Sequence, residues 1–280
     1  MEIIESISEI NRLLHTNSES GKIIGLVPTM GALHDGHATL ITSCVKNCNI
    51  SVVSLFVNPT QFNNPDDLKL YPRTPEKDFK FLEELSVDYL FYPSVAEMYP
   101  EPDKRQFDFG GLDKVMEGQF RPGHFNGVAQ VVSKLFSIVK PHKAYFGEKD
   151  YQQLQIVTKM TKQLNMNVEI IAVPTVREKS GLAMSSRNQR LTEDQKHNAS
   201  EIYRILSKSS LMMKNFQPVK LSEYVLNEIN NVPGLRVEYF QIVDGENLQP
   251  VTFWNDSDII VGCVAVYCGD VRLIDNIRYK

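Results

Sequence analysis

Apolar residues follow two different spacings along the chain, one typical of helices and one typical of buried strands. Between residues 3 and 14, aliphatic side chains recur every three or four positions, as in an amphipathic helix with one buried face. Short apolar runs rich in Val, Ile and Phe come later, and such runs are typical of parallel strands buried on both faces. The chain is therefore predicted to begin with a helix and to continue into a sheet.

Five apolar runs, separated by segments with helical spacing, predict a parallel sheet. The runs lie at residues 22–27, 49–57, 87–92, 143–146 and 167–173. The predicted helices between and after them lie at residues 32–47, 75–85, 125–139 and 150–164. Strands that alternate with helices form doubly wound sheets, which bind ligands beyond the carboxyl ends of the strands. We therefore predict an α/β, Rossmann-like domain over residues 1–175 that binds its ligands at this edge.

The pattern changes after about residue 175. A polar segment at 177–192 precedes helical spacing at 193–214 and 219–229, and apolar runs at 235–243, 259–267 and 271–277 end the chain. Helices followed by consecutive strands indicate a smaller C-terminal α+β domain, which we place at residues 176–280 and expect to close over the site. Residues 98–123, rich in glycine and proline, are expected to form a mobile cover.

Composition narrows the class of protein. The 280 residues carry 30 Lys and Arg against 34 Asp and Glu, a net charge of −4 that disfavours a nucleic-acid partner. The first ten residues are acidic where a signal peptide is basic, and no apolar stretch is long enough for a membrane span. The four cysteines do not have zinc-ligand spacing. We expect a cytoplasmic protein with no membrane partner.

The most informative segment, Pro28-Thr-Met-Gly-Ala-Leu-His-Asp-Gly-His37, connects the first predicted strand of the apolar runs to its helix. On a first helical turn, His34 and His37 project from one face, beside backbone N–H groups that favour anions. Gly31 lets the main chain approach a bulky ligand closely. Two imidazoles at a helix N-terminus can hold a polyphosphate, although solvated turn residues or half of a metal site are alternatives. The usual dinucleotide and P-loop motifs are absent.

Two further segments follow predicted strands and can face the same edge of the sheet. Gln61, in Phe56-Val-Asn-Pro-Thr-Gln-Phe62, can bind a hydroxylated acid or cap a loop. In Gly147-Glu-Lys-Asp-Tyr-Gln-Gln153, Asp150 can accept hydrogen bonds from ribose hydroxyls and Lys149 adds a cation. Taken alone, Lys149 and Asp150 fit a solvated helix start better, with Asp150 as its cap.

Three other groups of polar residues leave alternatives open. The hydroxyls and guanidinium of Met184-Ser-Ser-Arg-Asn188 suit phosphate oxygens, and an exposed linker is the alternative. In Arg121-Pro-Gly-His-Phe-Asn-Gly127, the Arg and His side chains either close over phosphates or hold the loop by hydrogen bonds. The paired acids Asp66 and Asp67 could approach a magnesium ion, or they could cap a helix.

Together these five segments resemble the pantoate–β-alanine ligase family of the nucleotidylyltransferase superfamily. The segments stand in the family's order between residues 28 and 188, and the resemblance thins beyond residue 192. His34-Asp-Gly-His37 looks like the His-x-Gly-His signature of the superfamily, and residues 184–188 resemble its Lys-Met-Ser-Lys-Ser loop, with Arg187 supplying the charge. The resemblance implies ATP-dependent condensation of (R)-pantoate with β-alanine through pantoyl adenylate, with Mg²⁺, in a homodimer. The domain over residues 1–175 would then bind nucleotide and pantoate.

The resemblance also implies roles for individual residues. The catalytic residues would be His34, His37, Lys149 and Arg187, with His37 the usual proton donor of the family; stabilisation of phosphate charge is the physically simpler role. Gln61 would contact both pantoate and β-alanine, and Gln153 would contact pantoate. The residues implied around ATP are Met30, Gly31, Ala32, Leu33, His34, Asp35, Gly36, His37, Gly147, Glu148, Lys149, Asp150, Val176, Met184, Ser185, Ser186 and Arg187.

Two other functions remain as alternatives at this stage. One is a different adenylyltransferase, which would transfer AMP to a phosphate ester and keep AMP in its product. The other is a tRNA-binding or regulatory module descended from an aminoacyl-tRNA synthetase, which the negative net charge disfavours.

Overall fold

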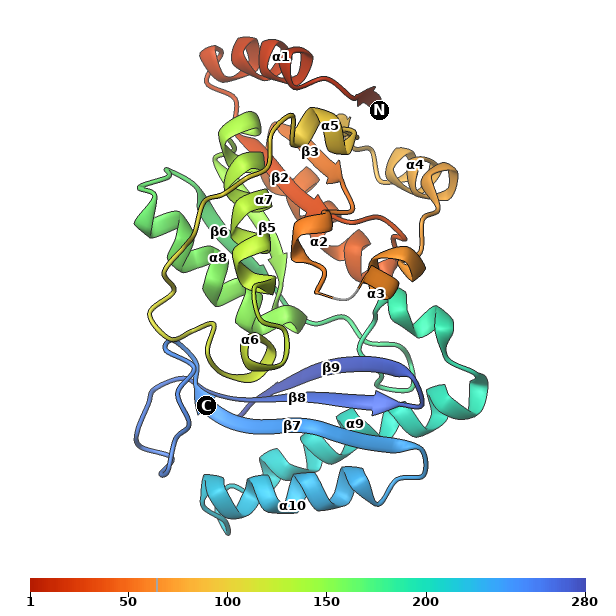
Figure 1. The fold of residues 1–280 in the computed structure, drawn as a ribbon, viewed down its shortest axis with the longest axis vertical. Helices are drawn as coiled ribbons and strands as arrows, with labels where there is room; N and C mark the ends of the chain where they lie inside the picture. Colours follow the sequence, from red (N-terminus) through yellow and green to blue (C-terminus); the bar gives the residue numbers. More distant parts are fainter. Residues whose placement is uncertain (64) are drawn as a thin grey trace. The chain divides into compact units, whose positions relative to one another are not determined.

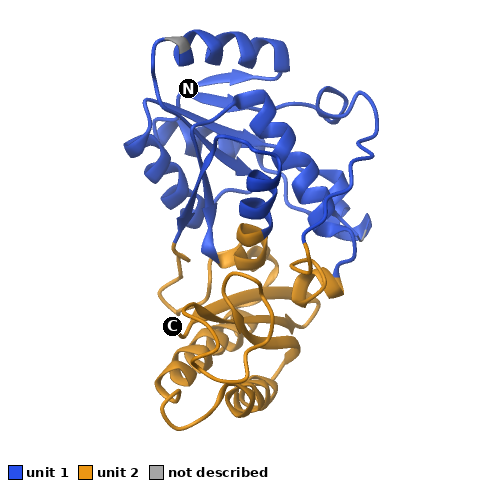
Figure 2. Cartoon of the chain, turned by 90° about the vertical axis from the view of Figure 1, so that its left-hand side faces the viewer, with its two compact units in different colours: residues 1–109, 121–148, 156–173 blue, residues 110–120, 149–155, 174–280 orange. Residues whose placement is uncertain are grey.

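The computed structural model describes residues 1–63 and 65–280, which divide into two compact units (Figure 2). Unit 1 comprises Met1–Phe109, Arg121–Glu148 and Ile156–Val173. Unit 2 comprises Gly110–Phe120, Lys149–Gln155 and Pro174–Lys280. Unit 2 thus includes two segments that the sequence division at residue 175 assigned to the first domain, and closure over the site stays a prediction.

Unit 1 is built on a six-stranded parallel sheet with the strand order β1-β4-β3-β2-β5-β6 (Figure 1). The strands are β1 (Glu2–Ile4), β2 (Ile24–Thr29), β3 (Ile50–Leu55), β4 (Tyr89–Phe91), β5 (Lys143–Gly147) and β6 (Glu169–Val173). The strand order reverses between β2 and β5, and α/β proteins bind ligands at the carboxyl ends of the strands at such a switch point. The predicted Rossmann-like sheet is confirmed.

The predicted N-terminal helix is wrong over its first residues. Glu2–Ile4 form the edge strand β1, in which Ile4 pairs with Phe91 of β4, and helix α1 spans Ile7–Glu19. The Ile7 N–H donates to Glu97 Oε1 at 2.7 Å, which satisfies one of the open donors at the start of the helix. A strand of three residues is too short to show its own period, so the helical spacing appeared to extend through it.

Helices cover both faces of the sheet. In β5, Tyr145 Oη lies 3.4 Å from Cys48 Sγ at the end of α2 (Asp35–Asn47). The next residue, Phe146, packs on Phe136 of α7 (His124–Val139), with ring centroids 6.4 Å apart. Adjacent residues of a strand point to opposite faces, so α2 and α7 lie on opposite faces of a doubly wound sheet. The remaining helices along this part of the chain are η1 (Pro59–Gln61), α3 (Pro65–Leu70), α4 (Pro75–Glu84), α5 (Val95–Met98), η2 (Glu148–Asp150) and α8 (Tyr151–Gln163).

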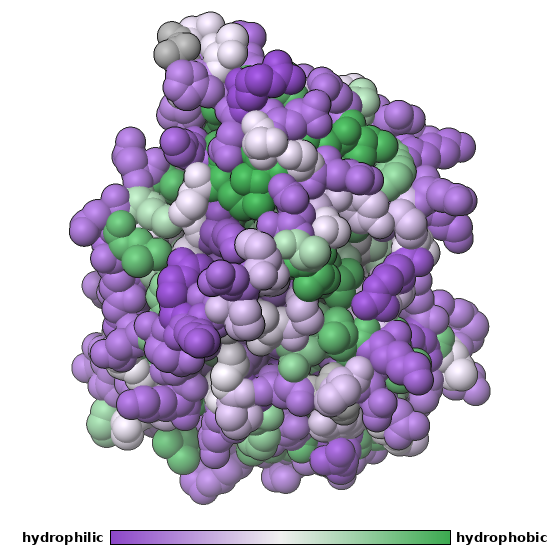
Figure 3. Space-filling model, turned by 45° about the horizontal axis from the view of Figure 1, so that its top comes forward, coloured by the Kyte–Doolittle hydropathy of each residue, from purple (hydrophilic) through white to green (hydrophobic). Residues whose placement is uncertain are grey.

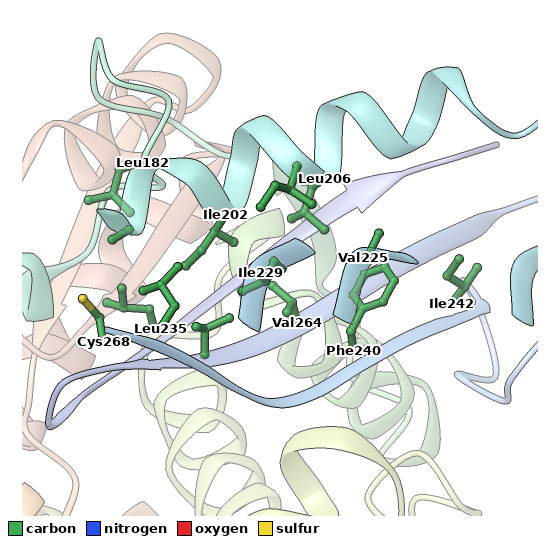
Figure 4. Packing of buried hydrophobic residues seen from close by; sticks show 14 of the residues in the cluster. Leu182, Ile202, Leu206, Val225, Ile229, Leu235, Phe240, Ile242, Val264 and Cys268 are labelled. Carbon is green, nitrogen blue, oxygen red and sulfur yellow. The ribbon is translucent and has the colours of Figure 1, made fainter. Parts of the chain in front are cut away.

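Unit 2 confirms the expected α+β organisation. Its antiparallel sheet has the order β7 (Leu235–Asp244), β8 (Ile260–Cys268), β9 (Val271–Arg278). Its helices are α6 (Met116–Phe120), η3 (Ser186–Arg190), α9 (Glu193–Leu211) and α10 (Pro218–Asn230). Figure 4 shows side chains of α9 and α10 packed against those of β7 and β8, and Leu182 of the polar segment joins this buried cluster. The core of unit 2 therefore anchors part of the polar segment.

Over residues 1–63 and 65–280, the structure contains no helix that combines the length and the hydropathy required to cross a bilayer. Hydrophilic residues predominate on the face shown in Figure 3, and hydrophobic residues there form separate patches.

Candidate active site

The loop after β2 is held by a buried carboxylate that the sequence analysis did not single out. Asp78, in the first turn of α4, is 2 % exposed and accepts hydrogen bonds from the Ala32 N–H (2.9 Å) and the Leu33 N–H (2.8 Å). Gly31 and Ala32 have φ values of +82° and +50°, so this turn needs support. In the sequence, Asp78 is indistinguishable from an acid that simply stabilises a helix start.

His34 and His37 lie together at the start of α2. The His34 Nδ1 accepts from the Gly36 N–H at 3.1 Å, and the His37 Nδ1 accepts from the His34 N–H at 3.3 Å. The ring centroids are 4.1 Å apart. A ring nitrogen that accepts a hydrogen bond carries no proton, so each neutral imidazole has its proton on Nε2. This reciprocal cap orients two N–H donors beside the positive end of a 13-residue helix.

Gln61 is held in place at the end of the β3 connection. Its side chain is mostly buried, at 8 % exposure. The Gln61 Nε2 donates to Met30 Sδ at 3.2 Å, and the Asn58 Nδ2 donates to Gln61 Oε1 at 3.2 Å. The amide of Gln61 is therefore fixed between residues that follow β2 and β3, with a defined donor end and acceptor end.

Arg121 and His124 support the same residue from the start of α7. The buried His124 places Nδ1 2.8 Å from the Gln61 carbonyl oxygen, and Arg121 Nη1 lies 3.2 Å from His124 Nε2. A guanidinium can only donate and a carbonyl can only accept, so His124 donates from Nδ1 and accepts at Nε2. Of the two roles considered from the sequence, these contacts favour holding the loop.

The Gly147–Asp150 segment leaves β5 directly beside β2. These strands are paired neighbours at the switch point, with Leu26 opposite Ala144. Apart from Gly147 and its two chain neighbours, no described residue has an atom within 4 Å of a Cβ placed on Gly147, so the space beside this main chain is open. The Lys149 carbonyl accepts a hydrogen bond from Asn276 Nδ2 at 2.9 Å, so β9 fixes the main chain of this predicted phosphate residue.

The polar segment forms a short hairpin followed by η3. The Met184 N–H donates to the Val176 carbonyl at 3.0 Å, and the turn contains Gly181, whose φ is +92°. The Ser185 Oγ then accepts from the Arg187 N–H at 3.3 Å, at the start of η3. The predicted nucleotide residues of this segment are thus part of a defined turn.

An ion pair anchors the hairpin to β9. Arg177 donates to both oxygens of Asp275, over 2.6 Å from Nη1 and 2.9 Å from Nη2. The guanidinium also stacks on Tyr203 of α9, 3.5 Å from the ring centroid. Both partners of the pair are largely buried, at 16 % and 6 % side-chain exposure. No local pattern in the sequence indicates this pair, because its partners are 98 positions apart along the chain.

Part of the segment expected to be a mobile cover is fixed within unit 2. Glu117 of α6 is buried, accepts two hydrogen bonds from Arg272 of β9, and accepts another from Tyr239 Oη at 2.9 Å. Gln152 Nε2 donates to the Leu112 and Val115 carbonyls at 2.7 and 2.8 Å. A buried carboxylate requires such partners, and this requirement overrides the flexibility suggested by composition. The neighbouring Gln153 is only partly buried.

The paired acids occupy the start of a short helix. Asp66 and Asp67 lie in the first turn of α3, where a helix N-terminus stabilises negative charge. Across residues 1–63 and 65–280, no three His, Cys, Asp or Glu side chains gather as a metal site. This position agrees with the helix-start interpretation, and the approach of Asp66 and Asp67 to a magnesium ion stays a prediction.

The fold and these loops define a doubly wound α/β protein with a histidine-capped helix at the switch point of its sheet. A family model described as pantoate-beta-alanine ligase matches residues 2–278. The chain belongs to the pantoate–β-alanine ligase family and is a ligase. The match also extends beyond residue 192, where motifs alone were no longer informative.

Individual relatives agree over the full length. The chain is 54 % identical over 280 residues to the pantothenate synthetase of Bacteroides fragilis, covering 100 % of this chain and 99 % of the relative. The crystal structure of pantothenate synthetase from Thermus thermophilus matches with a TM-score of 0.93 and 40 % identity, covering 100 % and 99 % of the two chains. The Francisella tularensis ligase, solved in complex with beta-gamma ATP and β-alanine, matches with a TM-score of 0.85 and 38 % identity, covering 100 % and 98 %.

Proposed function

We propose that this chain condenses (R)-pantoate with β-alanine, using ATP, to give pantothenate, AMP and diphosphate. The observation that carries the proposal is the reciprocal histidine cap at the start of α2, in a chain whose whole length matches the ligase family. The reaction requires activation because a carboxylate is a poor electrophile. ATP supplies the leaving group.

The chemistry proceeds in two steps. A carboxylate oxygen of pantoate attacks the α-phosphorus of ATP, and the bond from that phosphorus to the bridging oxygen breaks to release diphosphate. The β-alanine amine then attacks the acyl carbon of pantoyl adenylate, loses a proton, and expels AMP. Neither step needs a protein nucleophile, so catalysis consists of positioning and charge stabilisation.

His34 and His37 stabilise the phosphate charge in this proposal. Each imidazole holds its proton on Nε2, and a fixed N–H donor can bind a phosphate oxygen as negative charge builds up. Mg²⁺ enters as part of the MgATP substrate, since magnesium is commonly bound by phosphate oxygens with few protein ligands. Because diphosphate bound to Mg²⁺ needs little protonation to leave, we assign His37 to charge stabilisation.

The other nucleotide contacts are assigned by residue type and local geometry. Phosphate oxygens accept hydrogen bonds from the side chains of Lys149, Ser185, Ser186 and Arg187. Asp150 accepts hydrogen bonds from the ribose hydroxyls. The main chain of Gly31–Gly36 and Gly147–Glu148 approaches ATP closely. Val176 and Met184, joined by a backbone hydrogen bond, flank the nucleotide together with Met30.

Gln61 and Gln153 are assigned to the two acids. The fixed amide of Gln61 offers one donor and one acceptor, which suits the hydroxyl and carboxylate groups of pantoate and then the incoming β-alanine. Gln153, in the first turn of α8, contacts pantoate. We further propose a homodimer in the cytoplasm, and sedimentation equilibrium of the purified chain tests its oligomeric state.

Exchange of isotope between diphosphate and ATP tests the proposed reaction. The assay contains Mg²⁺ and pantoate, omits β-alanine, and is repeated with other small acids and with a phosphate ester. Exchange that requires pantoate supports reversible adenylate formation and identifies the substrate. Exchange only with another acid or with the ester contradicts the assigned substrate. If the folded protein binds ATP but shows no exchange with any acceptor, the result contradicts the proposed enzymatic activity.

A further inference from the structure

We propose that Asp275 and Asn276, consecutive residues of β9, are positioning residues that together set the placement of the phosphate-binding groups of unit 2. The inference rests on the proposed roles of Lys149 and of Ser185–Arg187. Neither β9 residue is assigned to a substrate. Each acts through a different segment.

Asn276 fixes the main chain at Lys149. Its Nδ2 donates to the Lys149 carbonyl at 2.9 Å, and its own N–H donates to Asp275 Oδ1 at 2.8 Å. Lys149 lies in η2, a 3₁₀ turn of only three residues. Because a lysine side chain is long and flexible, a fixed backbone is the protein's main means of limiting where its ammonium can reach.

Asp275 fixes the hairpin that leads to Ser185. Its carboxylate accepts both bonds of the Arg177 fork, and the Arg177 Nη1 also donates to the Gly181 carbonyl at 3.2 Å. Arg177 is opposite Ala183 in a β-bridge, directly before Met184. The ion pair therefore holds both sides of the hairpin at the point where the chain enters the predicted phosphate-binding turn.

The two anchors are rigidly linked because they are neighbours on a strand paired along its length with β8. Asp275 is opposite Val264 and Asn276 is opposite Cys263 in this ladder. A small cavity of unit 2 is lined by Lys149, Ser185 and Asp275 among others, so the two anchored segments lie close to each other. One dipeptide thus controls the spacing between Lys149 and the Ser185 turn.

Positioning has a different kinetic signature from general stability. Adenylate formation depends on the groups around the phosphates, and small misplacements of such groups can reduce a rate by about a hundredfold. Attack of β-alanine on supplied pantoyl adenylate does not involve the diphosphate. Loss of the β9 anchors should therefore impair the first half-reaction selectively.

The decisive variant is Asn276→Ala, with Asn230→Ala as its matched control. Asn230 also fixes main chain in unit 2, accepting from the Val237 N–H at 2.9 Å, but it is not next to a predicted phosphate residue. We would measure pantoate-dependent ATP–diphosphate exchange, KM for ATP, and pantothenate formation from supplied pantoyl adenylate. Urea unfolding of each variant supplies the stability reference.

For Asn276→Ala we expect kcat/KM for ATP in exchange to fall about tenfold, and the supplied-adenylate reaction to stay within about twofold of the parent chain. Two further variants, Arg177→Ala and Asp275→Asn, should lower the exchange rate by similar factors because both break the same ion pair. Their double variant should lower it by about the same factor as either single variant. If Asp275→Asn does not fold, the measurements on Asn276→Ala alone test the proposal.

Three results would overturn the proposal. Exchange at the parental rate in Asn276→Ala is one, and equal loss of both half-reactions is another. The third is an equal loss of exchange in Asn230→Ala, which would indicate a general effect of stability. If Lys149→Ala leaves exchange intact, the proposed role of Lys149 fails as well, and this outcome separates the two failures.

Discussion

The loop after β2 in unit 1 and the hairpin after β6 in unit 2 are both predicted to bind ATP, yet they are held in different ways. In the first, Asp78 accepts hydrogen bonds from two backbone N–H groups. The side chains of His34 and His37 also accept hydrogen bonds from backbone N–H groups at the start of α2. In the second, a side-chain pair between Arg177 and Asp275 holds the segment to β9. The first anchor acts on the main chain directly, whereas the second acts through a long side chain.

This difference determines which substitutions each region tolerates. Every residue type except proline supplies the backbone N–H groups that Asp78 binds at positions 32 and 33, so the carboxylate is the side chain on which this anchor depends. The pair in unit 2 depends on two residue types, and loss of either one leaves a largely buried charge. The predictions that follow test this contrast.

The largest expected effect is that of His37→Ala. Removing one fixed donor should lower the rate of pantoyl-adenylate formation by about 10²- to 10³-fold, because the donor acts where negative charge develops. A rapid-quench single turnover measures this step directly. His197→Ala, at an exposed position on α9, is the control and should have little effect. Near-normal turnover of His37→Ala would remove this residue from the mechanism.

Asp78→Asn is expected to have the next largest effect. The amide retains one acceptor but directs an N–H group at a backbone donor, which should lower the free energy of unfolding by about 2 kcal/mol. Urea unfolding measures the change, and the adenylation rate should fall with it. Glu76→Gln changes an exposed acid in the same helical turn and is the control. Equal stability of both variants would contradict the clamp.

Arg177→Lys should reduce the free energy of unfolding by about 1 kcal/mol, because lysine keeps the charge but loses the two-pronged fork. Urea unfolding measures this loss. Arg236→Lys is the matched control, since Arg236 also stacks on a tyrosine, 4.5 Å from the ring centroid of Tyr267. A comparable loss in the control would assign the effect to stacking, and not to the pair with Asp275.

The smallest expected effect depends on pH. Burial, with the nearby charges of Glu117 and Asp275, raises the pKa of Cys263 from its ordinary value of 9.0 to about 12. The folded state therefore holds this proton more tightly, so its contribution is full below pH 9 and decreases as pH rises toward 12. Between pH 7 and 9.5 the loss amounts to about 0.8 kcal/mol.

Urea unfolding of the parent chain and of Cys263→Ala at both pH values isolates this contribution. The variant should lose less free energy of unfolding between pH 7 and 9.5 than the parent does. Identical losses would show that the thiol does not titrate as its buried position between the carboxylates implies.

The sequence predicted the elements whose signals are local. The long strands and helices followed from apolar spacing, and the pairing of His34 with His37 followed from a separation of three residues at a helix start. The edge strand β1 and the short α6 were missed because three to five residues do not establish a period. The equally short β4 was predicted because it lies within a longer apolar run at residues 87–92.

The support of the site could not be predicted in the same way. Asp78 contacts a loop 45 and 46 positions away, and Asp275 contacts Arg177 98 positions away. Both acids occupy positions where solvated side chains are common, so their residue types alone carry no signal. The family resemblance identified the residues that are proposed to meet substrate, and the structure adds those that hold them.

The reciprocal histidine cap has a consequence for the response to ionic strength. Because both Nδ1 atoms accept backbone hydrogen bonds, the ring nitrogen left to donate to a phosphate oxygen is Nε2 in each imidazole. Their attraction for phosphate is therefore one of local dipoles acting over a few ångströms. Mobile ions screen such short contacts far less than they screen the attraction of exposed cations.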